Sequence, residues 1–180
     1  SGWKSRCLRP PDALAVSDND KDHLAAIAYR RYQASLKAAG GVDFDDLLLL
    51  TEDLFESCGE VREQEASLFD HLLVDEYQDT NGSQYRIVKG LAEGHRNLCV
   101  VGDDDQSIYG WRGARIENIQ QFSNDFSDSD IIRLEQNYRS TSTILNAANK
   151  LISHNQGRLG KNLWTDGADG EPISIYGAFN

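Results

Sequence analysis

Two short apolar runs, separated by a segment with helical periodicity, constrain the fold of this chain more than any other feature of its sequence. The runs are residues 71–75 and 97–101, and the segment between them has apolar residues at Tyr85, Val88 and Leu91. Such runs are typical of strands buried on both faces of a parallel sheet. A strand–helix–strand unit of about 30 residues has the length of a right-handed parallel crossover. The sequence therefore predicts an α/β fold, with a parallel sheet and flanking helices.

The other segments continue this alternation of helices and strands. Apolar spacing predicts helices over 20–39, 43–55, 83–93, 116–122 and 141–153, and a turn or short helix over 58–65. Residues 131–134 and 173–179 resemble two further strands. Pro10 and Pro11 predict an irregular segment over 1–18, because proline interrupts helices.

The negative charge of the chain is confined to one segment. The net charge is −11, but residues 41–80 contain 13 Asp and Glu against one Arg, so the rest is close to neutral. Contacts with nucleic acid outside that segment therefore stay possible. No apolar run approaches the roughly 18 residues of a membrane span, so no membrane partner is expected. The three cysteines lack the spacing of metal ligands, which predicts reduced thiols and a cytoplasmic protein.

Asp75 and Glu76 follow the first predicted strand. Ligands of open α/β sheets bind beyond the carboxyl ends of strands. One carboxylate can hold Mg²⁺ while the other orients or deprotonates an attacking water molecule. The alternative is a solvated acidic loop without function.

Polar and aromatic residues follow the second predicted strand, namely Gln106, Tyr109, Trp111 and Arg112. Exposed aromatic rings beside an arginine form a platform on which unpaired bases can stack, which favours binding of single-stranded nucleic acid. The alternatives are a tight turn that is capped by its side chains and a pair of aromatic rings in the core.

The third predicted strand leads to Tyr138 and Arg139, just before a helix. An arginine near a helix N-terminus can bind phosphate through two hydrogen bonds, and Tyr138 can stack on a base. Alternatively, Ser140 or Thr141 caps the helix and Arg139 forms a surface ion pair.

Four motifs, which follow one another in a fixed order, relate these segments to one protein family. Residues 73–80 (LVDEYQDT) resemble the Walker B motif of superfamily 1 helicases, residues 101–114 (VGDDDQSIYGWRGA) their third motif, and residues 134–140 (LEQNYRS) their fourth. Residues 42–48 (VDFDDLL) resemble a segment that precedes Walker B in the same group. Over 42–180 the chain thus resembles the UvrD-like family of DNA helicases (UvrD/Rep/PcrA), whereas 1–41 match loosely.

The resemblance implies two RecA-like motor domains of the P-loop NTPase class, with ATP in their cleft. Residues 1–40 would be the end of a helical insertion subdomain, 41–130 part of the first motor domain, and 131–180 the start of the second. The first domain would be incomplete, because the phosphate-binding loop G-x-x-x-x-G-K-[ST] does not occur in the sequence. The second would be incomplete too, because the later motifs of the family, including another phosphate-contacting arginine, would lie downstream. We therefore expect an internal fragment that neither hydrolyses ATP nor unwinds DNA by itself.

The family also implies a role for each candidate residue. Asp75 would coordinate Mg²⁺, Glu76 would be the general base, and Gln106 would sense the γ-phosphate. Tyr138 would stack on adenine, and Arg139 would contact the γ-phosphate.

The same comparison assigns the DNA contacts. Tyr109 and Trp111 would bind single-stranded DNA, and Arg112 would couple them to the Walker B strand.

The function implied is ATP-dependent translocation from 3′ to 5′ on single-stranded DNA and unwinding of duplex DNA in repair. Mismatch-repair and nucleotide-excision-repair proteins are the partners that the resemblance suggests. The alternatives are a truncated, non-catalytic module that binds single-stranded DNA or a partner, and the helicase half of a helicase–nuclease.

Overall fold

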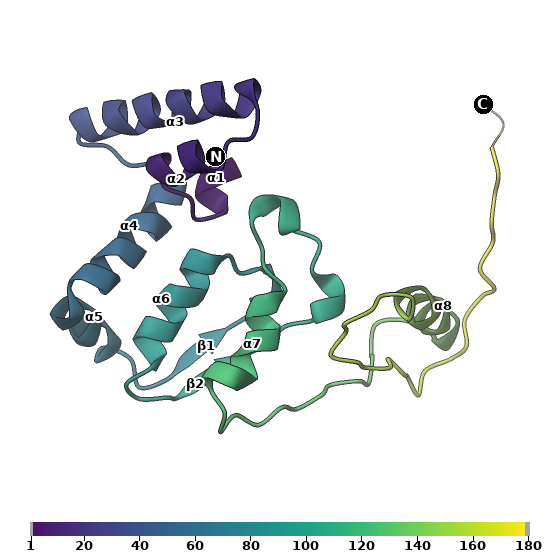
Figure 1. The fold of residues 1–180 in the computed structure, drawn as a ribbon. Helices are drawn as coiled ribbons and strands as arrows, with labels where there is room; N and C mark the ends of the chain where they lie inside the picture. Colours follow the sequence, from purple (N-terminus) through teal and green to yellow (C-terminus); the bar gives the residue numbers. More distant parts are fainter. Residues whose placement is uncertain (1, 179–180) are drawn as a thin grey trace. The chain divides into compact units, whose positions relative to one another are not determined.

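The computed structural model describes residues 2–178 and has a mixed α/β architecture. The chain divides into two compact units, Ser1–Phe122 and Ser123–Asn180. The first unit contains a small parallel sheet and most of the helices, and the second is built around one helix (Figure 1).

The sheet of the first unit is the predicted parallel pair. Strand β1 (Leu72–Val74) pairs with β2 (Leu98–Val100) in a register that places Leu72 opposite Leu98 and Val74 opposite Val100. Helix α6 (Gly82–Ala92) connects the two strands. It begins where Asn81 accepts a hydrogen bond from the backbone of Gln84 and the Gln84 side chain accepts one from the backbone of Asn81. The predicted strand–helix–strand unit is therefore confirmed.

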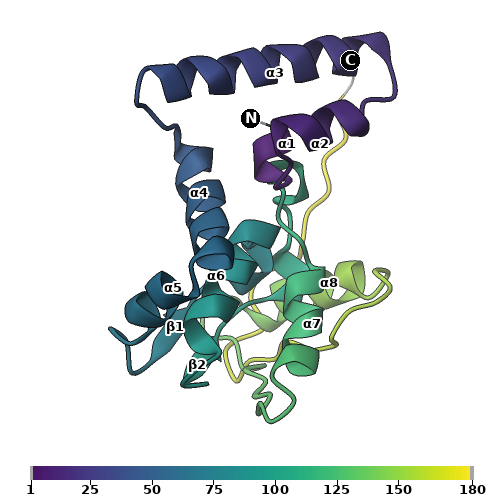
Figure 2. The same cartoon turned by 60° about the vertical axis from the view of Figure 1, so that its left-hand side comes forward.

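Long helices lead from the N-terminal region to this sheet. Helix α3 (Asp20–Ala38) is followed by α4 (Phe44–Ser57) and α5 (Gly59–Ala66), and α7 (Glu117–Asp125) comes after the sheet. Figures 1 and 2 both show α4 extending from the α1–α3 group toward α5 and the strands. Helix α4 packs on α1, α5 and α6, and its buried side chains include Leu49 and Phe55. The predicted helices are thus confirmed, and residues 58–65 are helical rather than a turn.

The prediction of an irregular N-terminal segment is wrong. Residues Gly2–Ser5 form α1, and Pro10–Ala15 form α2. Pro10 and Pro11 occupy the first turn of α2, where the missing N–H would have had no helical partner in any case. The prolines therefore begin a helix here instead of interrupting one.

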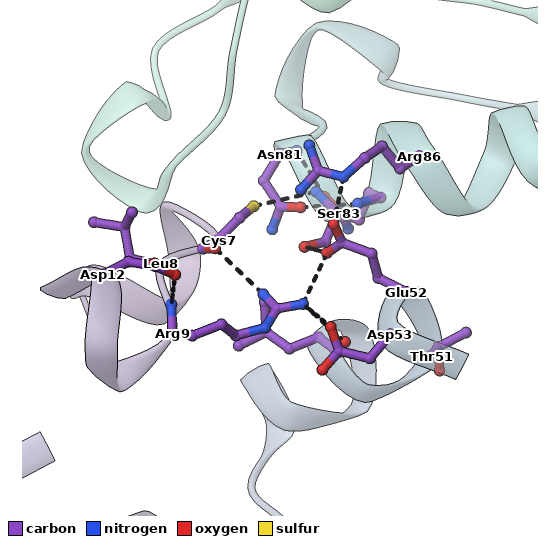
Figure 3. A network of polar contacts seen from close by, with 12 residues as sticks. Cys7, Leu8, Arg9, Asp12, Thr51, Glu52, Asp53, Asn81, Ser83 and Arg86 are labelled. Carbon is purple, nitrogen blue, oxygen red and sulfur yellow. Dashed lines mark hydrogen bonds and ion pairs between the residues drawn. The ribbon is translucent and has the colours of Figure 1, made fainter. Parts of the chain in front are cut away.

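Two buried charged residues connect this N-terminal segment with α4 and α6. Lys4 is 3% exposed, and its Nζ lies 2.7 Å from both Asp43 Oδ2 and Asp46 Oδ1. Glu52 is 5% exposed and accepts hydrogen bonds from Ser83 Oγ and Arg86 Nε (Figure 3). Buried charges are tolerated only when they are paired and hydrogen-bonded, and these bonds supply the partners that Lys4 and Glu52 require.

The predicted strands at 131–134 and 173–179 are absent from the described residues. Ile131, Ile132 and Leu134 are between 65% and 82% exposed. Residues 173–178 are likewise outside any strand, and Phe179 lies outside the described residues. A strand persists only if its N–H and C=O groups find a neighbouring strand, and the described part of the second unit has one isolated bridge, between Gln136 and Trp164.

The second unit is organised around α8 (Ser142–Ile152). Leu145 is buried, and the Asn149 side chain accepts a hydrogen bond from Leu163 N and donates one to Leu163 O. These contacts attach the segment after α8 to the helix.

Candidate active site

The end of β1 presents two carboxylates on a strained turn. Asp75 and Glu76 follow the strand directly, and both are exposed. Glu76 has φ 50° and ψ 42°, in the left-handed region. That conformation costs a residue other than glycine about 1–3 kcal/mol and clusters at functional sites, and Cys7 and Arg96 adopt it here as well. Asp75 Oδ1 accepts a hydrogen bond of 2.9 Å from Glu76 N, which holds the turn. This geometry leaves both carboxylates accessible to a ligand, so their catalytic role stays a prediction.

An open depression of about 370 Å³ lies beside the carboxylates. Residues of α4, β1, the turn after β1 and α6 line it: Leu48, Val74, Asp75, Glu76, Asp79, Thr80, Gln84, Ile87 and Val88. Asp79 Oδ1 is buried and has no hydrogen-bond partner among the described residues. Buried polar atoms are nearly always satisfied, by an ion or water if not by protein. Mg²⁺ prefers oxygen ligands and often keeps several water molecules, so the exposed carboxylate of Asp75 can hold it through one or two bonds. Among the described residues, only Asp103, Asp104 and Asp105 bring three carboxylates within 4.8 Å of one another.

Gln78 connects the end of β1 with the end of β2. Its side chain is 1% exposed. Its Nε2 donates to Glu76 Oε2 at 2.7 Å, and its Oε1 accepts from Asp103 N at 2.9 Å. Gly102 makes room for this amide, since a Cβ at that position would lie 2.8 Å from Gln78 Oε1.

Gln106 ends a short 3-10 helix, η2 (Asp104–Gln106), beyond β2. Its Nε2 donates to Asp103 Oδ2 at 2.6 Å. Gln106 is exposed, so it can contact a ligand while it remains bonded to Asp103. The structure therefore joins two predicted site residues, Glu76 and Gln106, through Gln78 and Asp103.

The aromatic pair of the same loop is exposed. Tyr109 is 39% and Trp111 72% exposed, which excludes the alternative of two core rings. Their ring centroids are 6.4 Å apart, and the Arg112 guanidinium lies over both, 4.7 Å from Trp111 and 5.6 Å from Tyr109. An arginine held over aromatic rings is an arrangement that binds bases and phosphates of single strands. Within residues 2–178 Arg112 makes no hydrogen bond to Asp75 or Glu76, so its coupling role stays a prediction.

The aromatic loop rests on the N-terminal helix α1. Gly113 has φ +89°, and a Cβ there would lie 2.0 Å from the carbonyl oxygen of Ser5. Only glycine combines this backbone angle with so close an approach. The loop that carries Tyr109 and Trp111 is therefore positioned by a segment more than 100 residues earlier in the chain.

Tyr138 and Arg139 belong to the second unit. Tyr138 is 86% exposed, and its hydroxyl donates to Gln136 Oε1 at 2.8 Å. Asn137 Oδ1 accepts from Arg139 N at 2.9 Å and from Ser140 N at 2.8 Å, which forms the turn before α8. Arg139 makes no ion pair with a described residue, and Thr141, the N-cap of α8, makes no capping hydrogen bond through its side chain. The side chains of Tyr138 and Arg139 are therefore accessible to a ligand.

Sequence analysis did not single out Gln78. The signal was present, because Gln78 lies within the Walker B-like motif, two residues after Glu76. Its importance depends, however, on a bond to Asp103, 25 residues away, which no local pattern shows.

Comparison with known proteins identifies the family. Residues 1–127 match the UvrD/REP helicase N-terminal domain, and residues 132–180 match the UvrD-like helicase C-terminal domain. The chain belongs to the UvrD-like DNA helicases.

Among the relatives are DNA helicase II of Escherichia coli, 57% identical over 152 residues, and ATP-dependent DNA helicase PcrA of Leuconostoc citreum, 49% identical over 178 residues. DNA helicase II of Haemophilus influenzae is 51% identical over 177 residues. The matches cover 84%, 99% and 98% of this chain, but 21%, 24% and 24% of the relatives. The chain thus spans less than a quarter of the length of these proteins. None of these similarities favours a non-catalytic binding module.

Within the described part of the chain, every helix is too short or too polar to cross a lipid bilayer.

Proposed function

We propose that this chain is the central part of an ATP-dependent DNA helicase that translocates from 3′ to 5′ on single-stranded DNA and unwinds duplex DNA in repair. The observation that carries the proposal is that the candidate ATPase residues and the candidate DNA-binding residues lie at the same edge of the sheet. Two carboxylates follow β1, an aromatic loop follows β2, and Gln78 joins the two strand ends. Relatives are named as DNA helicase II and as ATP-dependent helicase PcrA, which supports both ATP and DNA as ligands.

In the proposed reaction, Glu76 accepts a proton from water while the water oxygen bonds to the γ-phosphorus and the bond to the leaving oxygen of ADP breaks. Asp75 would hold Mg²⁺, which would neutralise charge on the phosphate oxygens. Gln106 would contact the γ-phosphate, and Arg139 of the second unit would add a permanent positive charge to it. Tyr138 would stack on the adenine.

Tyr109 and Trp111 would hold single-stranded DNA by stacking on its bases. Arg112 would support both rings, since its guanidinium lies within 6 Å of each. The family resemblance adds the proposal that Arg112 couples them to the Walker B strand. A net charge of −11 would otherwise repel DNA, so binding has to rest on such local contacts.

The proposal includes the domain organisation. We assign residues 1–40 to the end of a helical insertion, 41–130 to the first RecA-like motor domain, and 131–180 to the start of the second. The free thiols of Cys7, Cys58 and Cys99 support a cytoplasmic location. Repair proteins that recognise mismatches or excise damaged nucleotides are the proposed partners.

The test is ATP hydrolysis by a full-length helicase that carries these residues, with and without single-stranded DNA. Glu76→Gln should lower DNA-stimulated turnover by about 10²–10⁴-fold, the usual contribution of a general base. The matched control Glu60→Gln, at an exposed position of α5, should leave turnover unchanged. Strand displacement on duplexes with a 3′ or a 5′ single-stranded tail tests the direction. Full activity of Glu76→Gln, or unwinding only from the 5′ tail, would contradict the proposal.

A further inference from the structure

A continuous chain of hydrogen bonds runs between the two strand ends. From Glu76 Oε2 it passes to Gln78 Nε2 at 2.7 Å, and from Gln78 Oε1 to Asp103 N at 2.9 Å. From Asp103 Oδ2 it continues to Gln106 Nε2 at 2.6 Å. We infer that Gln78 is a positioning residue that couples the general base Glu76 to the γ-phosphate sensor Gln106. This inference rests on the proposed function.

The chemistry of Gln78 suits this role because a primary amide both donates and accepts. The backbone N–H of Asp103 can only donate, so it requires the carbonyl oxygen of Gln78 on its side. The amide nitrogen must then face Glu76, and it donates to the carboxylate that is to accept a proton. The Gln78 side chain therefore holds the carboxylate of Glu76 in a fixed orientation. It also links that orientation to the position of the loop that follows β2.

The surroundings of Gln78 transmit displacements of that loop. The side chain is 1% exposed, so water does not replace either hydrogen bond. Gly102 lies against the amide, and Ser107 Oγ donates to the backbone oxygen of Gln78 at 3.4 Å. Ser107 follows Gln106 and precedes the aromatic loop. A shift of this loop on binding DNA or phosphate consequently moves the Asp103 amide, then Gln78, and with it the carboxylate of Glu76.

The strained backbone of Glu76 makes this control effective. Glu76 has φ 50° and an exposed side chain. Its backbone binds Asp75 Oδ1 and Asp79 N, whereas its carboxylate accepts a hydrogen bond from Gln78. An error of about 1 Å in the position of a catalytic group can lower the rate by about 10²-fold. The hydrogen bond from Gln78 therefore determines whether the carboxylate of Glu76 is in position to accept a proton from the attacking water.

The test uses Gln78→Glu and Gln78→Met in a full-length helicase that carries this chain. A protonated glutamic acid donates and accepts as glutamine does, whereas its anion only accepts. DNA-stimulated hydrolysis by Gln78→Glu should therefore be retained at low pH and fall at least 10-fold between about pH 6 and about pH 9, because burial beside Glu76 raises the pKa of the new carboxyl. Gln78→Met should lose the DNA stimulation at every pH, with the KM for ATP and the Kd for a thymidine oligonucleotide within about twofold of the parent.

Gln121→Glu is the matched control, since Gln121 is exposed on α7, and its pH–rate profile should equal that of the parent. DNA stimulation that survives in Gln78→Met, or a pH profile of Gln78→Glu that parallels the parent, would overturn the inference. A loss of ATP and DNA binding in both variants at all pH values would overturn it too, because it would show a purely structural role. Failure of the proposed function is distinguishable, since the parent itself would then lack DNA-stimulated hydrolysis or Glu76→Gln would keep it.

Discussion

Replacement of Glu52 by glutamine tests whether the buried charge network holds the first unit together. Glu52 lies on α4 and is 5% exposed. It accepts hydrogen bonds from Ser83 and Arg86 of α6, and its Oε2 lies 3.5 Å from Arg9 Nη2 of the N-terminal segment (Figure 3). One carboxylate thus joins three segments of the chain.

The expected loss follows from these contacts. A hydrogen bond to a charged group stabilises a protein by about 1.5–3 kcal/mol. Glutamine keeps one acceptor oxygen, so the bond from either Ser83 or Arg86 can remain. Its NH₂ group then faces the other donor and cannot accept from it. The Arg86 side chain is 41% exposed, so water can compensate part of its charge. We therefore expect Glu52→Gln to lower the free energy of unfolding by about 2–3 kcal/mol, and Glu52→Ala by about 3–5 kcal/mol.

The stability difference between the parent and Glu52→Gln should depend on pH in a definite direction. Burial alone would raise the pKa of Glu52, but the hydrogen bonds from Arg86 and Ser83 outweigh it and hold the pKa below its ordinary value of 4.5. A carboxyl with a lowered pKa stabilises the folded state above its unfolded pKa and loses that effect as the pH falls through its folded pKa. The difference between the parent and Glu52→Gln should therefore be complete at neutral pH and shrink below about pH 4.5.

The assay is urea unfolding followed by circular dichroism at neutral and acid pH, with equal m-values required for a direct comparison. Glu56→Gln is the matched control, one turn further along α4 at an exposed position, and should change stability by less than about 0.5 kcal/mol. An equal effect of the two substitutions at neutral pH would refute the reasoning, as would a difference that grows when the pH is lowered.

Three further predictions concern the site. The 180-residue chain alone should release no phosphate from ATP, with or without DNA, because its sequence has no phosphate-binding loop; turnover that Glu76→Gln abolishes would contradict this. Trp111→Ala should weaken binding of a labelled thymidine oligonucleotide to a full-length helicase by about 1–3 kcal/mol in fluorescence anisotropy, and an unchanged Kd would exclude stacking on this ring. Gly113→Ala should displace the aromatic loop and weaken DNA binding, because its Cβ would meet the carbonyl oxygen of Ser5, whereas Gly110→Ala, with open space around its Cβ, should not; equal affinities of these two variants would argue against the docking of the loop on α1.

The local elements that sequence analysis predicted correctly are those with a strong internal signal. Helices α3, α4, α6 and α8 have apolar residues at helical spacing, and two of them begin with reciprocal capping residues at Asp43 and Asn81. These features depend on residues a few positions apart, so the sequence shows them directly.

Elements that depend on distant partners were predicted less well. Residues 131–134 have the composition of a strand, but a strand also requires a neighbour to which it can hydrogen-bond. Helices α1 and α2 were missed as well. Helix α2 begins with Pro10 and Pro11, which by sequence alone predict a helix break, and it packs on α3. The short helix α1 is held by Lys4, which binds Asp43 and Asp46, 39 and 42 residues later.

The sequence by itself determined the family, the parallel strand–helix–strand unit and the identity of the candidate catalytic residues, because motifs and periodicity are local properties of a chain. Only the tertiary structure decided that Gln78 joins Glu76 to the loop of Gln106, and that Gly113 rests on Ser5. Both contacts join segments that are 25 or more residues apart. Their geometry arises when strands pair and helices pack, since burial then forces each polar group to find a partner wherever in the chain it lies.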